Sequence, residues 1–191
     1  GTRASRRNQQ LHSVSLMKVA IMQPYFMPYL GYFQLITAVD RFVIYDDVNY
    51  IKRGYINRNA ILIDGHAHSF TLPLRKASQN KLIHEIELLD DDGWKGKLLN
   101  KIVHAYAKAP FFNDAYPVIE DAIRYPEANL SVYLVNCIRA LCAYLGIETE
   151  IVDSSRIFGN RGMARSERIT KGPMSPAAPT CVPPHSSTAS P

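Results

Sequence analysis

Cysteine is scarce in this sequence, and long apolar runs are absent. The chain has three Cys among its 191 residues. Cys137 and Cys142 lie five residues apart in one expected helix, a spacing that suits a disulfide bridge poorly. Such unpatterned thiols argue against a disulfide scaffold and for a reducing compartment. No apolar run approaches the roughly 20 residues of a membrane span, and the basic N-terminal stretch lacks the long apolar segment of a signal peptide. We therefore expect a cytoplasmic protein without a membrane span.

The central part of the chain also lacks an excess of charge. The formal net charge is +5, yet residues 17–159 contain 15 basic and 16 acidic side chains. The positive surplus lies in residues 1–16 and 160–171. A nearly neutral body lacks the electrostatic surface with which proteins bind duplex nucleic acid. Duplex nucleic acids are therefore not expected partners.

Most familiar catalytic and metal-binding patterns are missing as well. The sequence contains no Walker loop, no Gly-x-Gly-x-x-Gly fingerprint and no nucleophile elbow built on serine. His66 and His68 share one face of an expected strand, but no third ligand has a readable spacing. The histidines thus predict no metal site, and the sequence leaves the cofactor unknown.

Both ends of the chain differ in composition from the middle. Residues 1–16 show no apolar period, and a strand pattern begins abruptly after Met17. Residues 172–191 contain six of the twelve prolines and no charged residue. A stretch of this composition buries too little apolar surface to offset its ordering entropy. We expect a disordered extension over residues 1–16, an α/β domain over 17–159, and a degenerate, largely disordered tail over 160–191.

Within the middle region, the apolar periodicity predicts alternating strands and helices. Apolar runs without alternation are typical of strands that are covered on both faces. The dipeptide Asp64-Gly65 between two β-like runs indicates a hairpin. Strands are expected at 18–23, 41–45, 60–63, 67–72, 82–88 and 147–152, and helices at 28–39 (opened by Pro28), 93–108, 114–124 and 129–145. We predict an α/β fold with a Rossmann-like, mostly parallel sheet, an inserted antiparallel hairpin and a helical C-terminal half. The first two strands should be parallel neighbours, because one helix connects them.

Ligands of open α/β sheets bind beyond the carboxyl ends of the parallel strands. Two segments occupy such positions, residues 23–33 after the first strand and residues 46–59 after the second. The second segment contains two acidic, three basic and three Asn residues within 14 positions. Binding residues concentrate in loops of this kind.

The acidic and basic residues of the second segment suggest different tasks. Asp46 or Asp47 can serve as a general base or Mg²⁺ ligand, and the alternative is that both are turn residues. Lys52, Arg53 and Arg58 suit a phosphate or carboxylate, since Arg binds such groups through two parallel hydrogen bonds. We therefore expect an anionic small-molecule substrate.

Three motifs in these segments resemble the WbqC-like proteins of bacterial polysaccharide clusters. They are QPYF-x-PY-x-GYFQLI (residues 23–36), YDDV (residues 45–48) and IKRG-x-INRN (residues 51–59). The resemblance implies a transferase of surface-polysaccharide (O-antigen) biosynthesis, with transfer of an aminoacyl group such as glycyl to a nucleotide- or lipid-linked sugar. The alternative is a non-catalytic module that binds a nucleotide-sugar or a partner protein. Family members normally continue with another helix and strand, so the tail is interpreted as a truncation or frameshift.

The resemblance also suggests roles for individual residues. Asp46 or Asp47 would deprotonate the acceptor, and the three cations would hold the phosphate or carboxylate of the substrate. The remaining substrate-binding residues are expected to orient polar groups or to form the sharp turn and the wall of the pocket: Gln23, Tyr25, Tyr29, Gly31 and Asn57. A rigid aromatic turn that only packs is the structural alternative for the residues that follow the first strand.

Overall fold

The computed structural model describes residues 16–159 apart from residues 90 and 92. Except for Leu16, the predicted N-terminal extension and C-terminal tail lie outside these residues. The described residues up to Ser155 belong to one compact unit, and residues 156–159 belong to a second. The described part of the second unit includes most of the short 3-10 helix η2 (Ser155–Phe158).

The first unit contains a small parallel sheet, and the candidate site lies where the strands of this sheet end. The sheet contains β1 (Val19–Met22), β2 (Arg41–Ile44) and β7 (Glu150–Val152), in the order β1-β2-β7. β1 and β2 are parallel neighbours joined through α1 (Leu30–Thr37), as predicted. The apolar side chains of the central strand β2 are completely buried.

The other strands form two antiparallel pairs. β3 (Arg58–Ile63) and β4 (His66–Thr71) make the predicted hairpin, and β5 (Leu74–Arg75) pairs with β6 (Glu87–Leu88). Asp64 and Gly65 have φ values of 50° and 78° at the hairpin turn, the left-handed backbone that such turns require. The fold is mixed α/β with a small parallel sheet and antiparallel hairpins. Parallel strands are therefore a minority among the described strands, and the Rossmann-like arrangement stays a prediction.

Two local expectations are wrong in detail. The strand expected at 82–88 is the 3-10 helix η1 (Ile83–Glu85) followed by the short β6. The Leu82 amide donates to the Glu85 carboxylate over 2.9 Å, which closes a turn where a straight strand was expected. The first helix begins at Leu30, two residues after Pro28.

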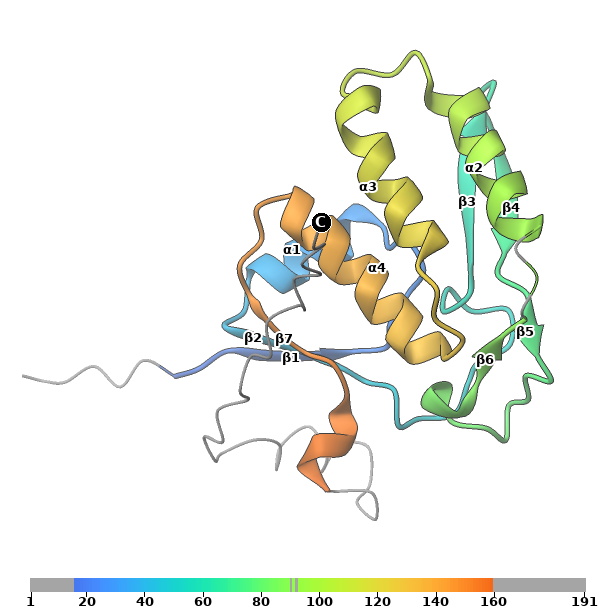
Figure 1. Cartoon of the computed structure of the whole chain (residues 1–191). Coiled ribbons are helices and arrows are strands. Elements are labelled where there is room, and N and C mark those ends of the chain that lie inside the picture. The colour runs from blue at the N-terminus through green and yellow to red at the C-terminus, as the bar shows by residue number, and fades with distance from the viewer. Residues whose placement is uncertain (1–15, 90, 92, 160–191) are drawn as a thin grey trace, which may run out of the picture. The chain divides into compact units, whose positions relative to one another are not determined.

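Three longer helices complete the first unit: α2 (Gly93–Tyr106), α3 (Phe112–Arg124) and α4 (Leu130–Tyr144). The Asn129 side chain caps α4 by accepting the Val132 amide over 3.2 Å. Figure 1 shows α1 and α4 on the same side of the parallel sheet and α2 alongside the β3–β4 hairpin. α4 contributes to both apolar clusters of the core, one with the parallel sheet and one with α2, α3 and the hairpin. In the described part of the chain, no helix has both the length and the apolar character needed to cross a bilayer.

Candidate functional site

The carboxyl ends of the three parallel strands bring polar residues to one edge of the sheet. Gln23 follows β1, Asp46 and Asp47 follow β2, and Ser154 and Ser155 follow β7. Because β2 is the central strand, its two aspartates lie between the ends of the other two. This edge is where open α/β sheets bind ligands.

Asp46 is buried, with 1% of its surface exposed. Its Oδ1 accepts the Ser154 hydroxyl over 2.6 Å, and its Oδ2 accepts the Ser131 hydroxyl over 3.1 Å. Ser131 lies in the first turn of α4, where the helix dipole favours a carboxylate. The Asp46 backbone carbonyl also accepts the His84 amide over 3.2 Å. Asp46 thus joins β2, η1, α4 and the end of β7.

Asp47 is also buried, at 4% exposed, and it has a different partner. Its Oδ1 accepts the Ser155 hydroxyl over 2.8 Å. The two neighbouring carboxylates therefore bind different serines.

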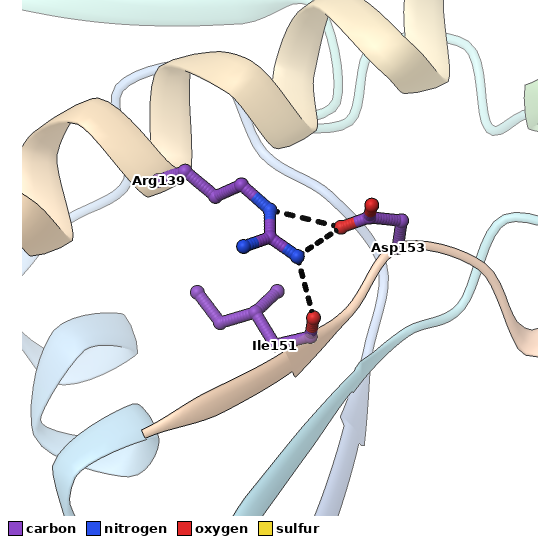
Figure 2. Close-up of polar contacts among 3 residues, drawn as sticks. All are labelled: Arg139, Ile151 and Asp153. Carbon is purple, nitrogen blue, oxygen red and sulfur yellow. Dashed lines mark hydrogen bonds and ion pairs between the residues drawn. The ribbon is translucent and has the colours of Figure 1, made fainter. Parts of the chain in front are cut away.

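Arg139 of α4 fixes the segment that supplies those serines. Figure 2 shows its guanidinium against Asp153 and the Ile151 carbonyl. Nε and Nη2 donate to Asp153 Oδ1 over 2.9 and 2.6 Å, and Nη2 also donates to the Ile151 carbonyl over 2.7 Å. Because Asp153 directly precedes the two serines, this clamp positions them beside the aspartates.

The two sequence segments predicted to form the site are brought together by hydrogen bonds. The Phe26 amide donates to the Ile56 carbonyl over 3.1 Å. The Asn59 Nδ2 donates to the carbonyls of Phe26 and Met27 over 3.1 and 2.5 Å. The turn after β1 and the loop after β2 are thus joined at a position where the chain reaches β3.

Three tyrosines gather at this junction, and we call Tyr25, Tyr29 and Tyr55 the tyrosine cluster. The ring centroids of Tyr25 and Tyr55 are 6.2 Å apart. Burial raises the pKa of Tyr25, and the neighbouring Tyr29 and Tyr55 raise it further. Tyr29 and Tyr55 remain 63% and 62% exposed. A Cβ on Gly31 would lie 2.6 Å from the Tyr29 ring, so glycine lets that ring lie across the start of α1.

Residues 50–59, which we call the basic loop, hold cations next to this cluster. Lys52 and Arg53 are exposed. Arg53 has a φ of 64°, a left-handed backbone that is uncommon for any residue except glycine. The Arg58 Nη2 donates to the Arg53 carbonyl over 2.8 Å. Burial raises the pKa of Tyr50, and the positive charge of Arg58 lowers it. Arg58 therefore supports the loop as well as contributing charge to it.

Two of the predicted binding residues form hydrogen bonds inside the protein, Asn57 through its side chain and Gln23 through its backbone. Asn57 is 6% exposed, accepts the Tyr50 hydroxyl over 2.7 Å and donates to the Leu72 carbonyl over 2.9 Å. The Gln23 carbonyl accepts the Tyr32 hydroxyl over 3.1 Å, while the Gln23 side chain is half-buried. Asn57 therefore anchors the basic loop to Leu72, the residue that directly follows β4.

Sequence reasoning missed the partners of the aspartates and one member of the tyrosine cluster. Ser131, Ser154, Ser155 and Tyr55 were not among the predicted site residues. A usable signal existed for the Ser154-Ser155 pair, because it follows the last expected strand directly and so falls at the same sheet edge. His66 and His68 are both exposed, and the described residues hold no group of three or more His, Cys, Asp or Glu side chains suited to a metal ion.

Comparisons with known proteins agree with the motif pattern. The uncharacterized protein Rv1507c of Mycobacterium tuberculosis H37Rv is 33% identical over 141 residues, which cover 73% of this chain. The aligned region spans 61% of the length of that relative. No solved structure matches the chain. Residues 23–185 match the profile of the WbqC-like protein family, a region that extends past residue 159, where we expect the folded domain to end. The chain belongs to the WbqC-like protein family.

Proposed function

We propose that this chain is a cytoplasmic transferase of bacterial surface-polysaccharide (O-antigen) biosynthesis. Its substrate is a phosphate-bearing sugar, either nucleotide- or lipid-linked. The observation that supports this best is the junction of the tyrosine cluster with the basic loop through the Phe26 and Asn59 hydrogen bonds. Flat aromatic faces offer apolar surface to a sugar ring, while arginine and lysine bind phosphate.

The proposed reaction transfers an aminoacyl group, such as glycyl, from an activated donor to the sugar. An amino or hydroxyl group of the acceptor attacks the acyl carbon, and the bond to the leaving group of the donor breaks. The acceptor proton passes to Asp46 or Asp47 at the centre of the sheet edge. Lys52, Arg53 and Arg58 hold the phosphate or carboxylate.

A non-catalytic module that binds a nucleotide-sugar or a partner protein is the second candidate. The burial of both aspartates and their serine partners favours it, because those contacts explain the two acids without any chemistry. Such a module would need the basic loop and the tyrosine cluster but neither carboxylate.

The binding half of the proposal is tested by calorimetric titration with UDP-N-acetylglucosamine. The variant with both Arg53→Ala and Arg58→Ala should bind about tenfold or more weakly, because it loses charge-assisted partners. Arg75→Ala, which removes an exposed arginine from β5, is the matched control and should bind like the unaltered chain. Equal affinity in the double variant would contradict the proposed anion site.

The catalytic half is tested by complementing a strain that lacks its own copy of the gene. Asp46→Asn and Asp47→Asn are each assayed by mass spectrometry of the surface polysaccharide for loss of its aminoacyl substituent. A transferase loses the substituent while the purified variant still binds the nucleotide-sugar. Retention of the substituent in both folded variants would favour the binding module.

A further inference from the structure

A pocket of about 270 Å³ lies between α2 and β4, away from the sheet edge described above. In Figure 1, α2 runs alongside the β3–β4 hairpin at this place. Phe70, Trp94 and Leu98 contribute apolar side chains, and Ser69 and Thr71 flank Phe70 along β4. The pocket therefore offers apolar and aromatic surface, as small-molecule sites do.

The aromatic wall of this pocket is held in place by its neighbours. The Trp94 ring packs edge-on against Tyr133, with centroids 6.3 Å apart and planes at 73°. The Lys95 Nζ lies 5.9 Å from the centroid of the Trp94 ring. Because Tyr133 and Lys95 contact the Trp94 ring, the ring can bind a flat ligand without a large further loss of side-chain entropy.

Two lysines add positive charge at the pocket. Lys97 and Lys101 both line it and are both exposed. They are four residues apart on α2, a spacing at which like charges on a helix repel each other. Within residues 16–159, leaving aside 90 and 92, neither forms an ion pair with an acidic side chain. An anion bound between the two ammonium groups would relieve that repulsion.

We propose that this pocket binds a small anion that has a flat apolar ring, such as an aryl phosphate or aryl carboxylate. The ring packs against Trp94, Phe70 and Leu98, and the anionic group lies between Lys97 and Lys101. The pocket volume restricts the ligand to a small molecule. This inference does not depend on the proposed transferase, since no residue of the basic loop or the tyrosine cluster lines the pocket.

Phenyl phosphate is a suitable probe, because Trp94 is the single tryptophan of the chain and lines this pocket. Titration of the full chain with phenyl phosphate should give a saturable change in emission. The variant with both Lys97→Gln and Lys101→Gln should bind about tenfold or more weakly. Inorganic phosphate lacks the ring, and benzyl alcohol lacks the charge. Each should bind to the unaltered chain no more tightly than phenyl phosphate binds to the Lys97→Gln/Lys101→Gln variant.

Two further variants control this measurement. Lys18→Gln with Lys108→Gln removes two exposed lysines outside the pocket and should bind like the unaltered chain. Arg53→Ala with Arg58→Ala disables the proposed transferase site and should also leave the fluorescence titration unchanged. The proposal is overturned by an emission change that does not saturate, by equal affinity in the Lys97→Gln/Lys101→Gln variant, or by inorganic phosphate binding as tightly as phenyl phosphate.

Discussion

Replacing Arg53 with glycine should stabilise the fold and weaken the proposed substrate binding at the same time. The Arg53 backbone has a φ of 64°, while the preceding residue, Lys52, has a negative φ. The left-handed conformation costs a residue other than glycine about 1–2 kcal/mol. Glycine adopts it freely but loses about 0.5–1 kcal/mol more in chain entropy on folding. The free energy of unfolding should therefore rise by up to about 1.5 kcal/mol in Arg53→Gly, or by about 0.75 kcal/mol from the middle of the two ranges.

Lys52→Gly is the matched control, because it also removes one exposed cation from the basic loop and adds one glycine. With no left-handed strain to relieve, it should lower the free energy of unfolding by about 0.5–1 kcal/mol. The hydrogen bond from Arg58 is retained in both variants, since it ends on a backbone carbonyl. Urea unfolding followed by circular dichroism measures the difference between the two variants, which we expect to be about 1–2 kcal/mol at an unchanged m-value. Equal destabilisation would refute the reasoning that the loop stores strain at a binding residue.

Three further predictions concern the surroundings of the site. Asp46→Ala removes the carboxylate that accepts two buried serine hydroxyls and should lower the free energy of unfolding by about 3–5 kcal/mol. Asp46→Asn should cost about half as much. A loss below about 1 kcal/mol in urea unfolding would show that this carboxylate does not hold the neighbouring elements together. Asn59→Asp should lower the melting temperature more than Asn59→Ala, because a carboxylate cannot donate to the two carbonyls that the Asn59 amide binds; the reverse order would contradict that contact. Burial raises the pKa of the Cys137 thiol to about 12 and also raises the pKa of Cys142. Both thiols are therefore protonated at about pH 8 and should react with Ellman's reagent only after unfolding. The measurement uses a variant in which the third cysteine of the chain, Cys181, is replaced by serine. Rapid labelling of the folded chain would be inconsistent with the burial of both thiols.

The sequence predicts best those elements that depend on local patterns. The unalternating apolar run of β2, the single crossover helix and the Asp-Gly turn led to the parallel β1–β2 pair and the hairpin, and the structure confirms both. The prediction of a strand over residues 82–88 was wrong, because the alternation of apolar and polar residues there does not correspond to the two faces of a strand. Its buried residues include Ile83 and Ile86, and a spacing of three fits a 3-10 turn better than a strand.

The sequence indicated which segments form the candidate site, but it did not indicate which residues contact each other there. The rule for strand ends led to both segments that the structure joins, and Asp46 and Asp47 lie at the sheet edge, while their chemical role stays a prediction. The serine partners of Asp46 lie 85 and 108 residues away in the chain. Such pairings depend on how α4 and β7 pack onto the sheet, which no local pattern records. Asn57 likewise lies in a loop whose composition is typical of a binding site. Only the tertiary structure reveals that its side-chain amide accepts the Tyr50 hydroxyl and donates to the Leu72 carbonyl.

The central claim is that the tyrosine cluster and the basic loop together bind a phosphate-bearing sugar. Hydrogen–deuterium exchange of the full chain, with and without saturating UDP-N-acetylglucosamine, tests it most directly. The account predicts slower exchange in residues 23–31 and 50–59, and no such protection in the Arg53→Ala/Arg58→Ala variant. Protection confined to other segments, or unchanged exchange throughout at a concentration where calorimetry detects binding, would contradict it.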